Sequence, residues 1–185
     1  MIILETIRLI IRDHIKDDLL DLYDLLSRKV EMYYLPELYV DTIEAAKENI
    51  EVSIQEQSKN GRTKYYFAII DKGTKKYVGE IGFTIEKNTN QGSLADLGYF
   101  IKKEYWGKGI TTEAGKKVID FGFDKLDIWK YKTGCLKENI GSEKVMKKLG
   151  FIKEGELRKH QYHNNMWKDK LAYGLLRDDW ISDKK

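Results

Sequence analysis

Alternation of apolar and polar residues predicts most of the strands in this chain. Residues 6–12 place Ile7, Leu9 and Ile11 on one side, which is the period of a strand with one buried face. Further strands are expected on similar patterns at residues 63–71, 77–86, 93–102, 130–136, 151–158 and 167–177. The strands between residues 63 and 102 follow one another through short turns, so they predict an antiparallel meander.

Helical periodicity predicts four helices. Leu19, Leu22 and Leu26 recur at helical spacing, with acidic residues early and basic residues late, as the helix dipole favours. The expected helices cover residues 17–28, 41–60, 110–124 and 139–149, with Asp41 as an N-cap and Gly150 as a C-terminal cap. The aromatic stretch 31–40 has no clear period and is expected to be a loop.

The order of these elements indicates an α/β fold in one domain, residues 1–185. A strand, a helix and a strand between residues 93 and 136 imply a right-handed crossover and a locally parallel pair within an otherwise antiparallel sheet. Only one proline and no Ser/Gly-rich linker occur, so no domain boundary is indicated.

Composition narrows the classes of function. The chain is 42% hydrophobic and 34% charged, and its net charge is +3. That near balance argues against a nucleic-acid-binding protein, which usually shows a concentrated basic face. The lone Cys135 excludes an internal disulfide. The start resembles no signal peptide and no run is long enough to span a membrane, so a cytoplasmic protein without membrane contact is expected.

The stretch Tyr105-Trp106-Gly107-Lys108-Gly109-Ile110-Thr111 follows a predicted strand and opens a predicted helix. Glycines allow a sharp turn and close approach of a ligand, and the first N–H groups of a helix stabilise an anion. The spacing fits neither a P-loop nor a dinucleotide fingerprint. Taken alone, this turn is equally compatible with an anion site for another phosphate-bearing ligand and with an ordinary strand-to-helix connection.

Two further motifs accompany this turn. Leu97-Gly98-Tyr99-Phe100-Ile101 precedes it, and Asn139-Ile140-Gly141-Ser142-Glu143 opens a later run that ends at Leu149-Gly150-Phe151. With these three motifs in this order, the chain from about Leu4 to Trp180 resembles the GNAT superfamily of acyl-CoA-dependent N-acyltransferases. It looks most like the branch of ribosomal-protein N-terminal (Rim-type) acetyltransferases.

The resemblance implies a mixed, mostly antiparallel twisted sheet with a V-shaped splay and helices on both faces. It implies acetyl-CoA as co-substrate and no metal. The implied coenzyme A contacts are Phe100, Ile101, Lys102, Trp106, Gly107, Lys108, Gly109, Ile110, Thr111, Asn139 and Ser142. The family often has Gln or Arg where this chain has Glu104. Because backbone N–H groups make the expected contacts, we expect Glu104 to point to solvent.

Glu80 and Ser142 are the candidate catalytic residues. Glu80 alternates away from the apolar residues of its strand, so it is a candidate general base, or else an exposed carboxylate. For Asp96, charge pairing or solvation is favoured over catalysis. At the position implied by the resemblance, Ser142 is a hydrogen-bond donor to the leaving thiolate; its structural alternative is a helix N-cap. Cys135 is expected to be buried and inert.

The expected function is direct acetyl transfer from acetyl-CoA to a primary amine, in particular a protein or peptide N-terminus. The alternatives are a small-amine, polyamine or antibiotic acetyltransferase and a coenzyme A-binding sensor without turnover. The loops 33–39 and 160–167 are candidate acceptor walls, and are equally plausible as contacts in a homodimer or as covers of the core. His160 and His163 lack a third ligand nearby, so no metal site is expected.

Overall fold

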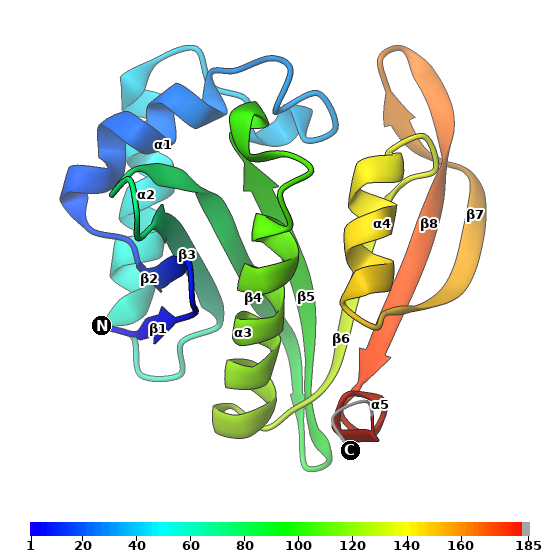
Figure 1. The fold of residues 1–185 in the computed structure, drawn as a ribbon. Helices are drawn as coiled ribbons and strands as arrows, with labels where there is room; N and C mark the ends of the chain where they lie inside the picture. Colours follow the sequence, from blue (N-terminus) through cyan, green and yellow to red (C-terminus); the bar gives the residue numbers. More distant parts are fainter. Residues whose placement is uncertain (183–185) are drawn as a thin grey trace. The chain divides into compact units, whose positions relative to one another are not determined.

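A computed structural model describes residues 1–182 of the chain (Figure 1). Its helices and strands are, in chain order, β1 (Ile3–Glu5), β2 (Leu9–Asp13), η1 (Lys16–Asp18), α1 (Leu19–Leu26), η2 (Pro36–Leu38), α2 (Ile43–Gln57), β3 (Lys64–Asp71), β4 (Tyr77–Thr89), β5 (Gly92–Ile101), η3 (Lys103–Tyr105), α3 (Ile110–Lys125), β6 (Ile128–Leu136), α4 (Ile140–Lys148), β7 (Ile152–His163), β8 (Met166–Leu176) and α5 (Arg177–Ser182), where η denotes a 3₁₀ helix.

The strands form one mixed sheet in the order β1-β2-β3-β4-β5-β6-β8-β7. Strands β5 and β6 pair in parallel, from Ser93 opposite Ile128 to Asp96 opposite Lys132. The pairs β1–β2, β2–β3, β3–β4, β6–β8 and β7–β8 are antiparallel. The mixed, largely antiparallel sheet and the parallel crossover expected from the sequence are therefore confirmed.

The chain divides into two compact units. The first contains residues 1–84 and 98–118, and the second contains residues 85–97 and the chain from 119 onward. Strands β4 and β5 and helix α3 each run from one unit into the other. The predicted V-shaped splay concerns residues of both units and stays a prediction.

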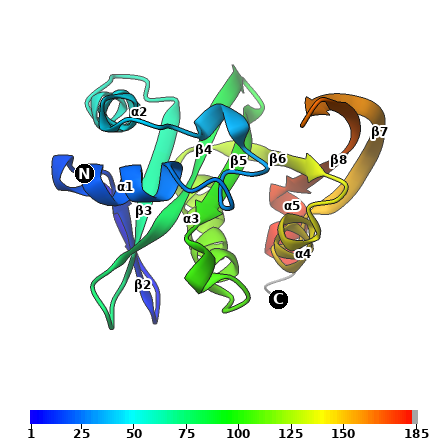
Figure 2. The same cartoon turned by 90° about the horizontal axis from the view of Figure 1, so that it is seen from above.

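In the first unit, helices cover both faces of the strands. A buried cluster joins α1 and α2 to strands β3 and β4 and contains Leu22, Leu25, Leu26, Ala46, Ile50, Ala68 and Tyr77. Phe67 and Ile69, which flank Ala68 on β3, point to the opposite face and are fully buried. The part of α3 within this unit lies on that opposite face (Figures 1 and 2), where Ala114 and Val118 are buried.

Gly79 lets the end of β5 approach β4 closely. A Cβ atom at Gly79 would lie 2.4 Å from the carbonyl oxygen of Phe100 and 2.6 Å from the Cα of Ile101. Only a residue without a side chain fits there. The N–H of Lys102 then donates to the carbonyl of Val78 at 2.8 Å. Backbone contacts therefore help to hold the last residues of β5 in place.

In the second unit, β7 is longer than predicted. We expected a strand that ended at Arg158 and a loop from His160 to Asn165; instead β7 continues to His163. The hairpin to β8 turns at Asn164 and Asn165, whose φ angles are 48° and 59°. Asparagine tolerates this left-handed conformation better than most residues, as a two-residue hairpin turn requires.

Two smaller differences from the prediction concern the N-cap of α2 and an additional strand. The N-cap of α2 is Thr42, whose side chain accepts a hydrogen bond from the N–H of Ala45, and not Asp41 as predicted. Strand β1, which the sequence pattern did not reveal, pairs with β2. Within residues 1–182, none of the helices has the length and apolar character needed to cross a bilayer.

Replacing Gly79 by alanine should destabilise the protein. The new methyl group would force Phe100 and Ile101 away from β4, and such overpacking costs about 1–3 kcal/mol. Urea unfolding measures the loss. Gly98→Ala on β5 is the matched control, because a Cβ there meets no atom within 4 Å. Equal stability of the two variants would contradict the close approach.

Candidate active site

The glycine turn lies between η3 and α3, within the first unit. Gly107 and Gly109 have φ angles of 72° and 75°, a left-handed conformation that costs glycine little and other residues more. A Cβ at Gly107 would meet nothing within 4 Å, so open space lies above the turn. Trp106 does not face that space with its ring N–H, which donates to the carbonyl of Ile101 at 3.0 Å.

The start of α3 carries unpaired donors. The N–H of Glu113 donates to the carbonyl of Gly109, which leaves the preceding helical N–H groups, including those of Ile110 and Thr111, without acceptors inside the helix. The side chains of Ile110 and Thr111 are buried. An anion at this position would therefore meet backbone groups and the positive end of the helix dipole.

Arg8 fixes this turn to the start of the chain. Its guanidinium donates to the carbonyl of Lys108 at 3.0 Å and to the carboxylate of Glu113 at 2.6 Å. The N–H of Arg8 also donates to Glu113. One arginine thus holds both the turn and the first turn of α3, and the arrangement was not visible in the sequence because about a hundred residues separate the partners.

At the end of β5, the side chains of residues 100–102 already contact other parts of the protein, so only the backbone is available to a ligand. Phe100 packs on the core of the first unit, and Ile101 is buried. The ammonium of Lys102 lies 3.1 Å from Asp21 and 2.9 Å from Asp24. Burial acts to lower the pKa of Lys102, but hydrogen bonds to the two aspartates outweigh it and raise that pKa. The ammonium of Lys102 is consequently occupied by ion pairs with α1.

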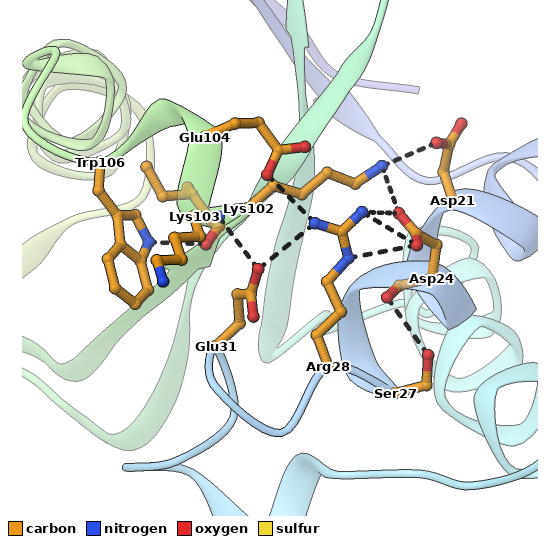
Figure 3. A network of polar contacts seen from close by, with 10 residues as sticks. Asp21, Asp24, Ser27, Arg28, Glu31, Lys102, Lys103, Glu104 and Trp106 are labelled. Atoms are coloured by element: carbon orange, nitrogen blue, oxygen red, sulfur yellow. Dashed lines mark hydrogen bonds and ion pairs between the residues drawn. The ribbon is translucent and has the colours of Figure 1, made fainter.

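Arg28 connects the loop after α1 to η3 (Figure 3). It pairs with Asp24 at 2.7 Å and with Glu104 at 3.1 Å. Glu31 accepts from Arg28 and from the N–H of Lys103. The side chain of Glu104 is exposed, in line with the prediction that it points to solvent, and it is also paired with Arg28. This pairing offsets a negative charge close to the glycine turn.

Glu80 is not an exposed strand carboxylate. Its side chain is only 14% exposed, and its Oε2 lies 2.9 Å from Nε2 of His14, whose side chain is fully buried. Nδ1 of His14 lies 3.5 Å from Asp18, and Arg12 makes two hydrogen bonds of 2.7 Å to Asp18. This cluster could not be predicted from the sequence, because no motif joins its members.

The pKa values in this cluster reflect pairing that overcomes burial. Burial tends to lower the pKa of His14, but the nearby carboxylates of Asp18 and Glu80 raise it to about 9. Burial tends to raise the pKa of Asp18, but Arg12 and His14 hold it well below its usual range. His14 is therefore an imidazolium at neutral pH, and Asp18 is a carboxylate.

In the second unit, Asn139 rather than Ser142 caps α4. The side chain of Asn139 accepts from the N–H of Ser142 at 3.1 Å, so the N-cap alternative for Ser142 is wrong. Ser142 also forms a hydrogen bond with the buried Cys135. Burial raises the pKa of that thiol to about 11, although the bond from Ser142 acts to lower it. Cys135 is thus a thiol at neutral pH, as expected for an inert residue.

Tyr173 was missed because it lies on β8, far along the chain from α4. Its hydroxyl donates to Glu143 at 2.7 Å, next to Ser142. Burial, followed by the hydrogen bond to Glu143, raises the pKa of Tyr173. The fold thus places a phenol on the carboxylate next to Ser142.

The other candidate residues named from the sequence contact side chains of the same chain. Asp96 lies 3.5 Å from Lys132 of the same chain, whereas its pairing with a substrate charge stays a prediction. Tyr33 and Tyr34 pack edge to face, and Tyr162 and Trp167 do so on the β7–β8 hairpin. No group of three or more His, Cys, Asp or Glu side chains suited to a metal ion occurs among the described residues.

A family model described as "Acetyltransferase (GNAT) domain" matches residues 8–152. The chain belongs to this family. Among curated relatives, the probable N-acetyltransferase YjcK of Bacillus subtilis (strain 168) is 35% identical over 116 residues, which are 62% of this GNAT chain and 63% of YjcK. The putative ribosomal N-acetyltransferase YdaF of the same organism is 37% identical over 90 residues, 49% of each chain.

Spermidine N(1)-acetyltransferase of Escherichia coli (strain K12) is 31% identical over 91 residues, again 49% of each chain. The GNAT chain therefore matches between 49% and 63% of the length of these relatives. A GNAT-family acetyltransferase structure from Bacillus anthracis is 26% identical with a TM-score of 0.81, covering 96% of this chain and 99% of that one. The GNAT fold predicted from the sequence is confirmed.

A further solved structure supports the fold alone. Spermidine N-acetyltransferase from Vibrio cholerae, solved with CoA and spermine, has a TM-score of 0.81 at 20% identity, and the match covers 94% of this chain and 98% of that one.

Because Asn139 is the N-cap of α4, substitutions of Asn139 and of Ser142 should differ in their effect on stability. Asn139→Ala removes the side chain that accepts from the N–H of Ser142 and should lower the free energy of unfolding by about 1 kcal/mol. Ser142→Ala keeps that cap and should cost less. Urea unfolding of both variants measures the difference, and a larger loss for Ser142→Ala would overturn the assignment.

Proposed function

We propose that this GNAT chain transfers the acetyl group of acetyl-CoA directly to a primary amine, with a protein or peptide N-terminus as the acceptor. We further propose that its two units work as a single acetyltransferase domain. The observation that carries the proposal is the glycine turn at the start of α3, where open space lies beside Gly107, in a chain of an acetyltransferase family.

The donor end of the reaction rests on backbone groups. The pyrophosphate of coenzyme A is a suitable anion for the N–H groups of Gly107 to Thr111. The backbone of Phe100 to Lys102 would pair with the extended arm of the same molecule, much as an added strand does. Lys102 and Trp106 contribute through backbone and packing, because their polar side-chain atoms already have protein partners. Asn139 and Ser142 stay predicted contacts.

The chemistry requires a neutral amine. Its nitrogen attacks the thioester carbon, the C–N bond forms, the C–S bond breaks, and the amine proton leaves to a base. An α-amino group has a pKa of about 7.7–8.0, against about 10.4 for lysine. A single carboxylate acting through water therefore suffices for an N-terminus. In our proposal Glu80 is this base, with Oε2 bonded to His14 and Oε1 directed at the acceptor.

The relatives offer two acceptors, a ribosomal protein for YdaF and spermidine for the E. coli enzyme. A polycation would be favoured by carboxylates free of partners. Near η3 the carboxylates of Asp24, Glu31 and Glu104 are instead paired with Arg28 and Lys102. This neutralisation favours a peptide terminus over a polyamine.

Incubation with acetyl-CoA and a panel of peptides, spermidine and aminoglycosides tests the proposal. Thiol release and mass spectrometry should detect acetylated peptide N-termini. Glu80→Gln should lower kcat about 100-fold and flatten the basic side of its pH profile, whereas Glu86→Gln, further along β4, should not. Binding of coenzyme A without turnover of any amine would indicate a sensor instead.

Arg28 should matter for acetyl-CoA through Glu104. Arg28→Ala leaves Glu104 as an unpaired negative charge near the proposed pyrophosphate site, and should raise the KM for acetyl-CoA about 2- to 5-fold, as expected for a partly exposed pair. Added Glu104→Gln should restore it. Lys47→Ala, which breaks an exposed pair on α2, is the control. Failure of the second substitution to restore KM would refute the charge explanation.

A further inference from the structure

His14 is a buried charged group that the proposed reaction does not yet use. It follows β2 and its side chain is fully buried, yet its carboxylate partners lie on different elements, η1 and β4. Burying an ion is costly unless its partners are well placed. Packing alone does not explain why an imidazolium is fully buried here.

The geometry forms a chain of ionic contacts from the interior to the candidate base. Arg12 holds both oxygens of Asp18 at 2.7 Å. Asp18 also accepts from the N–H of Ile15 at 2.9 Å and lies 3.5 Å from Nδ1 of His14. Nε2 of His14 is 2.9 Å from Oε2 of Glu80. The carboxylate of Asp18 thus lies beside the ring whose other nitrogen bonds to Glu80.

The surroundings of His14 are close to neutral in sum. Arg12 of β2 and His14 itself are balanced by Asp18 of η1 and Glu80 of β4. Tyr77 of β4 places its ring 6.3 Å from the imidazole, and α2 contributes the amide of Gln57, which donates to the carbonyl of His14 at 2.8 Å.

Two further ionisable groups lie beside this set. Asp13, next to His14 in sequence, is paired separately with Arg62 at 2.7 Å. Loss of the proton from His14 would therefore leave Glu80 without its charged partner.

We propose that His14 is a positioning residue for the acetyl transfer: it holds Oε2 of Glu80 so that Oε1 faces the acceptor amine. This inference rests on the proposed role of Glu80. Glu80 takes the proton from the attacking amine through Oε1 and releases it to water, while His14 keeps its own proton throughout. Asp18 acts one step further back, by keeping the imidazole in place.

A pH profile separates positioning from a purely structural role. In the wild type, kcat/KM for a peptide acceptor should fall as pH rises through about 9, where His14 loses its proton. His14→Gln can still donate to Glu80 but has no titrating group. It should lower kcat about tenfold at neutral pH and abolish the fall above pH 9. Lys47→Ala, on the exposed side of α2, should change neither. A variant profile that keeps the same alkaline fall overturns the inference.

An NMR titration of the imidazole tests the contact without activity. The signal missing in His14→Gln identifies His14. Its midpoint should lie near pH 9 in the wild type and shift downward in Glu80→Gln and in Asp18→Asn, since each removes a negative partner. An unchanged midpoint in Glu80→Gln overturns the inference. A shifted midpoint together with normal turnover of Glu80→Gln shows instead that the contact exists but that the proposed base is wrong.

Discussion

The close approach of β4 and β5 at Gly79 is the constraint on which the candidate donor site depends. With no side chain at this position, Phe100 and Ile101 lie against the backbone of β4, and Lys102 bonds to Val78. The end of β5 is thereby fixed before the chain enters η3. The ring N–H of Trp106 donates to the carbonyl of Ile101. The position of the glycine turn therefore depends on the end of β5, which packs closely against β4. Donors that are already in position need not rearrange when an anionic ligand binds.

A site built from backbone N–H groups leaves its side chains available for other contacts. Lys102 joins α1 through Asp21 and Asp24, and Glu104 joins the following loop through Arg28 (Figure 3). The residue that differs from the common family pattern, Glu104, is therefore compatible with an anion site, because its charge has a partner. The same contacts connect α1 and the residues just after it to the segment that we propose for the donor.

The sequence predicted those features that depend on neighbours in the chain. The turn between β5 and α3, the meander and the parallel crossover all follow from local periodicity and glycine positions. The contacts of Glu80 with His14 and of Arg28 with Glu104 could not be predicted, since 66 and 76 residues separate the partners. The length of β7 was underestimated because most of its residues are exposed, so no apolar alternation marks its second half. The sequence suggested Ser142 as a cap, and only the geometry showed that Asn139 caps the helix.

The acid–base demands of the reaction can be compared with what the second unit contains. Cys135 and Tyr173 are both held in their neutral forms, since burial raises each pKa, and the Tyr173 proton is already donated to Glu143. Neither is suited to deliver a proton. A thiol of ordinary pKa near 8.5 leaves readily as a thiolate and can take its proton from water. A hydroxyl that only donates a hydrogen bond, such as that of Ser142, is then sufficient, and the more demanding step is removal of the amine proton. This asymmetry places the rate-determining chemistry of our proposal at Glu80, whose carboxylate His14 holds.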